Sequence, residues 1–362
     1  MIKQKRNEFS VFVLIAAACW LMGYSVVMTE RTAETARAAL HMFAHSVLPS
    51  LALFSVCSKL LVKLGAMKKL ARLPMGGLLR ALGVSAGGFS AFLVGALAGF
   101  PTGAVMLAEL CERGEISREE AESLLPFCNQ AGIAFLLGTV GNVIFRDSRM
   151  GFIFFFAQTV TAWVCICLTA GERAECERGA VPCAPRECSP ISVVTASVRE
   201  SAFAMIGVCG FIVFFCLIGT ALFDTVQALG FPVGELLRAL LSGFLEISGG
   251  FLALSEGNFS GESVWILGGA FLGFGGCSVF LQAVEKTERF FFSPQKYFKG
   301  KLLASLICPI FTLLFCSLYE KTDGKNLIIV SALFIFCISS LFNFVKIKFF
   351  SKKCGKIKRN AV

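Results

Sequence analysis

The chain has 362 residues, of which 56% are hydrophobic and 16% are charged, and its mean hydropathy of +0.75 excludes a water-soluble globular domain. Its apolar runs are continuous and reach the roughly 20 residues that cross a bilayer, which predicts an all-α polytopic membrane protein rather than a β-barrel. The net charge of +10 does not indicate nucleic-acid binding, because the basic residues lie at the ends of apolar segments, where they set membrane topology.

Eight apolar segments are long enough to be transmembrane helices. In chain order they are residues 9–28, 40–64 (interrupted at Pro49), 118–145, 151–170, 201–229, 262–285, 302–318 and 327–345. A short polar connection at 29–37 separates the first two. Both chain ends and the connections at 63–80, 112–118, 171–199 and 285–301 carry most of the basic residues, so the positive-inside rule predicts that both termini are cytoplasmic.

The apolar stretch at 84–111 contains helix-breaking residues at its centre. Gly99, Pro101 and Gly103 disfavour one continuous helix, because proline removes an amide donor and glycine loses much backbone entropy. Irregular backbone at membrane depth is tolerated only where protein covers it or where it lines a cavity. These residues therefore predict a re-entrant helical hairpin whose tip lies near 99–103.

A second stretch of this kind spans residues 235–256. Placing Gly99 over Gly243 aligns the two stretches, although a register that pairs Gly99 with Gly273 is also open. Two interrupted segments in corresponding halves of a chain indicate a transporter-type site. The alternative is that the segments are continuous and that their glycines only allow close helix packing.

Two of the longer apolar segments are interrupted as well. The segment at 118–145 breaks near Asn129 and Gln130, and the segment at 262–285 breaks within residues 273–278. Polar side chains in an apolar run are costly unless they are paired or wetted, so these breaks indicate either hydrogen bonds between helices or backbone that is unwound to meet a solute. The second interpretation is favoured beside a hairpin tip.

Each half of the chain then has the same order of a span, a hairpin, an interrupted span and a span. Because each half has an odd number of crossings, the second repeat is predicted to be inverted relative to the first. The expected units are an N-terminal helix with its connection (1–37), the first repeat (38–170), a cytoplasmic linker (171–196), the second repeat (197–320), and a C-terminal helix with a basic tail (321–362).

The interruptions are predicted to meet near the bilayer midplane and to form a solute site. Glu246 is its strongest indication, because a carboxylate at membrane depth costs about 2.5–3.5 kcal/mol and needs a hydrogen-bond partner, a proton or a coupling ion, H⁺ or Na⁺. The competing interpretation is that Glu246 is wetted near the interface. The predicted side chains are Thr102, Asn129, Gln130, Glu246, Ser248 and Ser278, with Gln282 one turn away. The predicted backbone positions are Gly99, Pro101, Gly103, Gly132, Gly249, Gly250, Gly273 and Gly275.

Enzyme chemistry is not indicated, because the chain lacks P-loop, HExxH and GxSxG motifs. His41 and His45 share a helical face, but no carboxylate or Cys accompanies them, which favours polar residues at a helix entrance over a metal site. Most of the 16 Cys lie in apolar segments. Three others are irregularly spaced in one loop (Cys176, Cys183 and Cys188), so neither a metal nor a cofactor is predicted.

Several of these motifs are similar to those of the sporulation integral membrane protein YlbJ family. They are GFPTGA at 99–104, SREEAE at 117–122, FCNQAG at 127–132, GFIVFF at 210–215, LEISGG at 245–250 and GFGGCSV at 273–279. The family belongs with nucleoside-recognition, or Gate domain, proteins, which are similar to the core of concentrative nucleoside transporters. The resemblance implies a membrane protein of endospore-forming bacteria that acts in spore cortex formation, with Glu246 and Asn129 as counterparts of solute-binding residues.

The sequence thus predicts a membrane protein of sporulation that moves a small polar solute, nucleoside-like or other, across the cell membrane. The alternative is a non-transporting scaffold or assembly factor of the spore envelope that has kept the same fold. The expected partners are membrane lipid, the solute and a coupling ion, with a homo-oligomer left open.

Overall fold

The computed structural model describes residues 2–65, 84–169, 189–290 and 292–322, and every regular element in these ranges is a helix. Six helical segments are long and apolar enough to cross a membrane: Ser10–Val27, Thr29–Lys63, Ser148–Leu168, Pro190–Ala228, Gly261–Phe290 and Pro294–Lys321. They account for six of the eight predicted spans, which confirms a polytopic helical membrane protein. The predicted span at 327–345 lies outside the described residues.

The polar connection predicted at 29–37 is wrong. Helix α2 (Thr29–Met42) continues through a π-helical turn, η1 (Phe43–Val47), into α3 (Leu48–Lys63). Residues 29–37 are polar but are mostly good helix formers and include neither glycine nor proline, so nothing in them ends a helix. Pro49 does not interrupt the segment either, because it lies in the first turn of α3, where a missing amide costs little.

Helix α10 (Pro190–Ala228) begins well before the predicted start at residue 201. The Ser189 hydroxyl accepts a hydrogen bond from the Ser192 amide at 3.2 Å, and Pro190 follows it at the first helical position, which is a strong helix-start signal. Residues 190–196 of the predicted linker are therefore helical, and most of the remaining linker lies outside the described residues.

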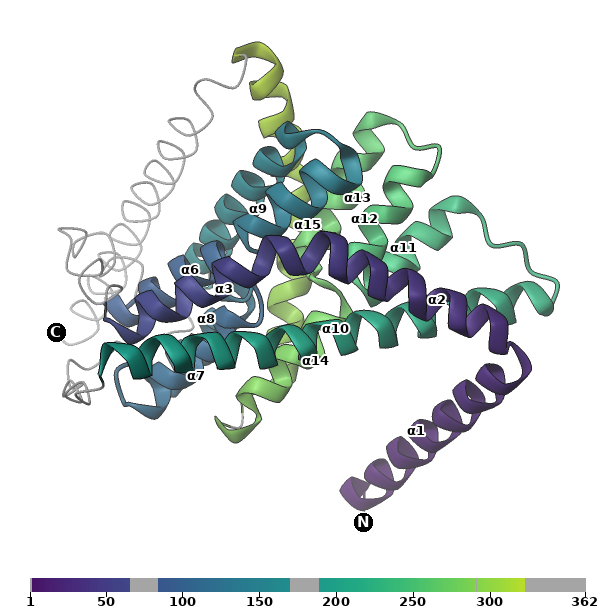
Figure 1. The fold of residues 1–362 in the computed structure, drawn as a ribbon, viewed down its shortest axis with the longest axis horizontal. Helices are drawn as coiled ribbons and strands as arrows, with labels where there is room; N and C mark the ends of the chain where they lie inside the picture. The colour runs from purple at the N-terminus through teal and green to yellow at the C-terminus, as the bar shows by residue number, and fades with distance from the viewer. Residues whose placement is uncertain (1, 66–83, 170–188, 291, 323–362) are drawn as a thin grey trace, which may run out of the picture.

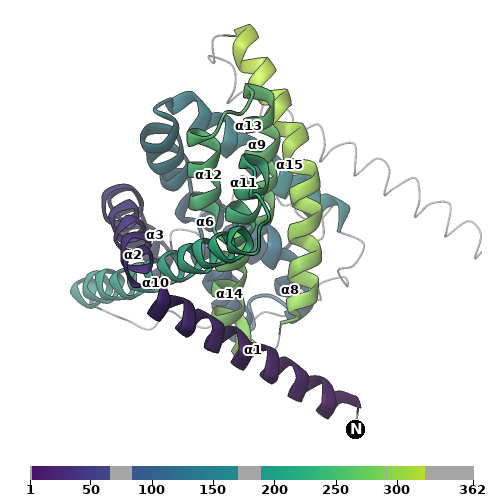
Figure 2. The same ribbon diagram turned by 90° about the vertical axis from the view of Figure 1, so that its right-hand side faces the viewer.

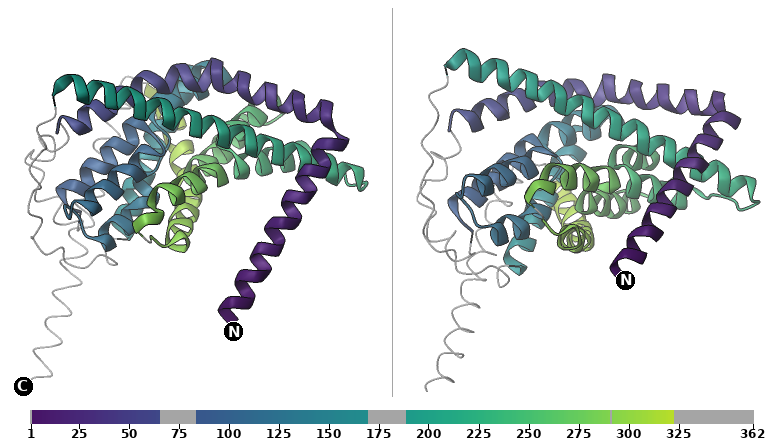
Figure 3. Two further views of the ribbon diagram at one scale, coloured as in Figure 1. Left: turned by 60° about the horizontal axis from the view of Figure 1, so that its bottom comes forward. Right: turned by 90° about the horizontal axis from the view of Figure 1, so that it is seen from below.

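Two long helical segments, α2–α3 and α10, pack against each other and cross one face of the molecule (Figures 1 and 3). Figure 2 shows them on one side, with α15 (Pro294–Thr322) on the other side and the shorter helices between them. Helix α1 (Ile2–Val27) extends away from this body. It is held near its end by the Tyr24 hydroxyl, which donates to the Asp224 carboxylate of α10 at 2.6 Å.

In each half of the chain, shorter helices follow a long helical segment. After α3 come α6 (Ala86–Ala98), α7 (Thr102–Glu112), α8 (Arg118–Cys128), the π-helix η2 (Phe135–Phe145) and α9 (Ser148–Leu168). After α10 come α11 (Glu235–Leu245), α12 (Ile247–Glu256), α13 (Gly261–Phe274), α14 (Gly276–Thr287), the short η4 (Glu288–Phe290) and α15. The helices thus end and restart within the four predicted regions of interruption.

The two predicted hairpins are built on the same kind of glycine crossing. In α6–α7, a Cβ on Gly103 would lie 3.2 Å from the Cα of Gly95, and in α11–α12 a Cβ on Gly250 would lie 2.4 Å from the Cα of Gly243. Gly243 therefore corresponds to Gly95, not to Gly99, and the predicted register is wrong by about one turn. Glycines in both stretches are needed because a side chain at the crossing would meet the partner helix or the helix that follows, at Cys128 of α8 or Phe271 of α13.

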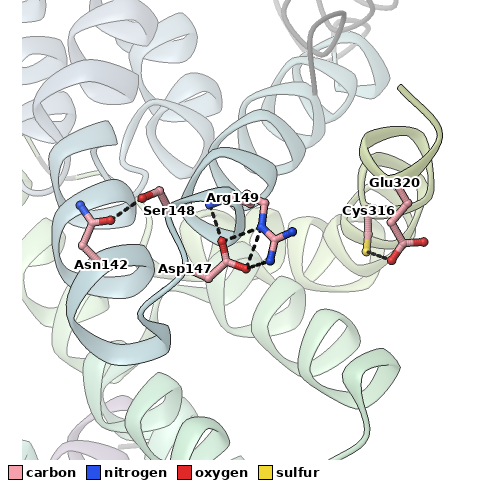
Figure 4. Close-up of polar contacts among 6 residues, drawn as sticks. All are labelled: Asn142, Asp147, Ser148, Arg149, Cys316 and Glu320. Carbon is pink, nitrogen blue, oxygen red and sulfur yellow. Dashed lines mark hydrogen bonds and ion pairs between the residues drawn. The ribbon is translucent and has the colours of Figure 1, made fainter. Parts of the chain in front are cut away.

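A tight turn joins η2 to α9 at one end of the molecule (Figure 4). Arg146 adopts a left-handed conformation with φ = 54°, and the carboxylate of the next residue, Asp147, accepts a hydrogen bond from the Arg149 amide at 2.9 Å. The Arg149 guanidinium also donates to both oxygens of that carboxylate. The Ser148 hydroxyl donates to the Asn142 side chain at 2.7 Å, which ties the start of α9 back to η2.

Candidate functional site

Glu246 lies between α11 and α12 and is 4% exposed. Its side chain caps α12: one carboxylate oxygen accepts from the Gly249 amide at 2.8 Å, and the other accepts from the Ser248 hydroxyl at 3.2 Å. A helix N-terminus carries partial positive charge, so it stabilises a buried carboxylate. Glu246 is thus buried inside the protein, and its position at membrane depth stays a prediction.

The break between α13 and α14 packs directly against Glu246. A Cβ on Gly276 would lie 3.3 Å from the carbonyl oxygen of Leu245 and 3.4 Å from the Cα of Glu246. On α14, the Gln282 amide donates to the Ser278 hydroxyl at 3.1 Å, while its carbonyl oxygen is buried and has no partner among the described residues. An acceptor left without a donor at such a place favours a ligand or a water.

A small internal cavity of about 20 Å³ joins these groups, and it has room for roughly one water molecule. Its polar lining comes from the second half of the chain: Glu246, Ser248, Ser278 and Gln282. The first half contributes only apolar residues: Val47, Leu51, Phe100 and Phe135. The Phe100 and Phe135 ring centroids lie 6.4 Å apart. Three of the six predicted site side chains are therefore brought together, with Gln282 added.

A larger, open cavity of about 500 Å³ reaches the same carboxylate from the other side. Helices α2, α10, α11 and α12 form its walls, and Glu246 contributes to its lining as well as to that of the internal cavity. Charged residues of both signs line it: Arg31, Glu34, Glu235, Arg238 and Glu256. Glu246 thus lines both an open cavity with charged residues and a small, mostly apolar one.

The other three predicted side chains line neither cavity. Thr102 is half-buried at the start of α7, and Gln130 is 2% exposed with both amide atoms lacking a partner among the described residues. Asn129 belongs to a separate cluster, where its side-chain amide donates to the Tyr297 hydroxyl at 2.8 Å and its backbone carbonyl accepts from Lys301. Their role in a solute site stays a prediction.

Four of the predicted backbone glycines are needed for one of two different reasons. Gly99 and Gly275 have φ of +80° and +86°, which side-chain-bearing residues rarely adopt. Gly103 and Gly273 are instead needed for close approach, because a Cβ would lie 2.0 Å from the Cys128 carbonyl oxygen and 2.4 Å from the Ala304 carbonyl oxygen respectively. The helix breaks and the close packing that the sequence offered as alternatives therefore occur together.

Sequence reasoning missed the polar residues that support these breaks from neighbouring helices. The side chain of Gln158 on α9 binds both backbone groups of Ala131. Its amide donates to the Ala131 carbonyl at 2.8 Å, and its oxygen accepts from the Ala131 amide at 3.1 Å. Lys301 was predicted in a cytoplasmic connection, but α15 begins at Pro294 and carries Lys301 into the core, where it is 3% exposed. Pro294 was the available signal, since proline is favoured in a first helical turn.

His41 and His45 stack on each other with ring centroids 4.1 Å apart. Within the described ranges, no group of three or more His, Cys, Asp or Glu side chains is placed to hold a metal ion. The predicted loop of three cysteines, Cys176, Cys183 and Cys188, lies outside them.

No protein-family model matches the chain. The chain is similar to the sporulation integral membrane protein YlbJ of Bacillus subtilis (strain 168), with 31% identity over 152 residues. The alignment covers 41% of this chain and 36% of the relative, so the match spans about a third of the relative's length. The similarity and the membrane-spanning helices together identify an integral membrane protein related in part to a sporulation protein.

Proposed function

We propose that this protein is a permease for a small polar solute that acts during spore formation. The observation that carries the proposal is the position of Glu246, which lines both an open cavity of about 500 Å³ and a small cavity whose polar lining it shares with Ser248, Ser278 and Gln282. Intramembrane acidic residues that face a cavity mark solute and ion pathways more often than they serve packing.

The chemistry of the internal cavity suggests the class of solute. Glu246 and the Gln282 side-chain oxygen accept hydrogen bonds, Ser278 can donate or accept, and Phe100 and Phe135 form an apolar wall. Such a set fits a neutral or cationic solute with hydroxyl or amino donors and one flat apolar face, as nucleoside-like compounds have. A solute larger than water needs the α11–α12 pair to move, as alternating access provides.

The helix order supports an inverted repeat. In this proposal, residues 38–170 and 197–320 are the two repeats, and α6–α7 and α11–α12 are re-entrant hairpins. Each pair has a glycine crossing and packs against the end of the helix that follows it, at Cys128 of α8 or Phe271 of α13. Neither Ala86–Ala98 nor Glu235–Leu245 is long enough to cross a bilayer by itself.

The place in sporulation is supported by the similarity to the Bacillus subtilis protein, whose name states that it is a sporulation integral membrane protein. Since the alignment covers about a third of that relative, the solute is inferred from the cavity alone.

A thermal-shift screen of the purified protein in detergent tests the proposal. The compounds are nucleosides, dipicolinate, cortex peptidoglycan precursors and metal ions. A compound present at 100 times its Kd should add about 2.7 kcal/mol to the free energy of unfolding. The shift should disappear in Glu246→Gln and persist in Glu256→Gln, which removes a charge from the open cavity only. Ser278→Ala should weaken binding about 2- to 10-fold, and Thr102→Ala should not.

Uptake of the identified compound into proteoliposomes then tests transport itself. A shift that Glu246→Gln leaves intact would remove Glu246 from the site. If no compound shifts the protein and Glu246→Gln still supports spore formation, the chain is a scaffold or assembly factor rather than a permease.

A further inference from the structure

Lys301 is a buried lysine that has no carboxylate partner among the described residues. It is 3% exposed, and in the described part of the chain it forms no ion pair with a carboxylate. Its ammonium donates one hydrogen bond, to the backbone carbonyl of Asn129 at 2.5 Å. A buried charge needs compensation from its surroundings, so the position of this ammonium has to be favourable for a cation in some other way.

The compensation comes from a helix end and an aromatic ring. Helix α8 ends at Cys128 and is capped by Asn129, while α13 ends at Phe274 and is capped by Gly275. The Lys301 ammonium contacts the first cap directly, and a Cβ built on Gly275 would lie 3.8 Å from it. Helix C-termini carry partial negative charge, so the end of α8 favours the ammonium that it binds. At Gly275 the ammonium lies beside the junction where α13 ends and α14 begins. The Tyr297 ring, 5.8 Å from the ammonium, adds a cation–π contribution.

Backbone carbonyl oxygens at helix C-termini can be ligands for a small cation. In transporters with broken helices, unwound backbone carbonyls and half-helix C-termini coordinate Na⁺ or H⁺. Here the unwound residue is Asn129, whose carbonyl is bound by Lys301 and whose side-chain oxygen is buried without a hydrogen-bond partner among the described residues. The α8 break therefore has the features of a cation position, and the cation that occupies it is covalently attached to α15.

We propose that Lys301 is a tethered cation that takes the place of a mobile coupling ion at the junction of the two helix breaks. Its ammonium holds the caps of α8 and α13 together, and the protein therefore needs no Na⁺ at this position. The part of this proposal that concerns solute coupling rests on the proposed function. Whether a cation occupies the position beside Asn129 can be measured without any solute.

The test is the thermal stability of the purified protein in chloride salts of matched ionic strength. The cations are Na⁺, methylammonium and the bulky N-methyl-D-glucamine. The wild-type midpoint of unfolding should be the same in all three salts. Lys301→Ala removes the ammonium and leaves space, so its midpoint should fall and should recover saturably with Na⁺ or methylammonium but not with N-methyl-D-glucamine. Lys301→Met refills most of that space and should not respond to any of the salts.

Lys296→Ala is the matched control, because Lys296 lies on the same helix and pairs with Glu122 at the surface. It should show no cation dependence beyond that of the wild type. A saturable Na⁺ shift in the wild type, or a response of Lys301→Ala no different from that of Lys301→Met, would overturn the proposal. The wild-type outcome can overturn the proposal even if Lys301→Ala fails to fold. Since no solute is present, the result is independent of the permease assignment.

Discussion

Gly99 and Gly132 touch backbone to backbone. A Cβ on Gly99 would lie 2.7 Å from the Gly132 nitrogen, and a Cβ on Gly132 would lie 2.8 Å from the Gly99 nitrogen. The break between α6 and α7 therefore packs on the break between α8 and η2. The second half shows the same relation, because Gly276 packs against Glu246 and Ile247. In each half, one interruption supports the next, so the unwound backbone is buried in protein as membrane depth requires.

Gly132→Ala should destabilise the protein. The added methyl group meets backbone atoms that cannot rotate away, and overpacking of this kind costs about 1–3 kcal/mol or more. The measurement is the midpoint of thermal unfolding in detergent. Gly210→Ala in α10 is the control, since its Cβ would have no neighbour within 4 Å and alanine is a better helix former. Equal midpoints for the two variants would show that the contact between the breaks is not tight.

Gln158→Leu should loosen the backbone around Ala131. The substitution keeps the approximate volume but leaves the buried amide and carbonyl of Ala131 without their partner, at about 1–3 kcal/mol for each group. Hydrogen exchange, read by mass spectrometry on peptides covering residues 129–134, should become faster. Thr159→Val serves as the control, because the Thr159 hydroxyl donates to the Phe155 carbonyl of its own helix and to no other group in the described part of the chain. Unchanged exchange in Gln158→Leu would mean that another group already protects Ala131.

The turn before α9 should make stability depend on acid pH. The Arg149 guanidinium holds the pKa of the Asp147 carboxyl below its ordinary value. A lowered pKa in the folded state adds stability that is present above the ordinary value of about 4 and is lost as the pH falls through the lowered value. Asp147→Asn keeps a helix-capping side chain but removes this charge. Its midpoint of unfolding should fall below that of the wild type at pH 7, and the difference should shrink below about pH 4.

Glu262→Gln is the control for that experiment. Glu262 is an exposed carboxylate in the first turn of α13. Its replacement should leave the difference between pH 7 and pH 4 as it is in the wild type. If the midpoints of the wild type and Asp147→Asn still differ by the full amount at the lowest pH measured, the ion pair forms no part of the acid response.

The sequence by itself determined the class of protein and the places where its helices break. Continuous apolar runs admit only helices in a bilayer, and Gly99, Pro101 and Gly275 end helices through their own backbone chemistry, whatever surrounds them. The same local chemistry made Glu246 stand out, because a carboxylate in an apolar run has a cost that depends little on the rest of the fold.

Only the tertiary structure decided which polar groups share a site. Asn129 was as polar in sequence as Ser278, yet it faces Tyr297 and Lys301 rather than the cavity beside Glu246. In sequence, Lys301 does not differ from the exposed lysines around it. In the structure, its place on α15 puts it beside the ends of α8 and α13. The contacts of Asn129 with Tyr297 and Lys301 join residues more than 100 positions apart, and no local pattern encodes them, because they depend on how whole helices pack.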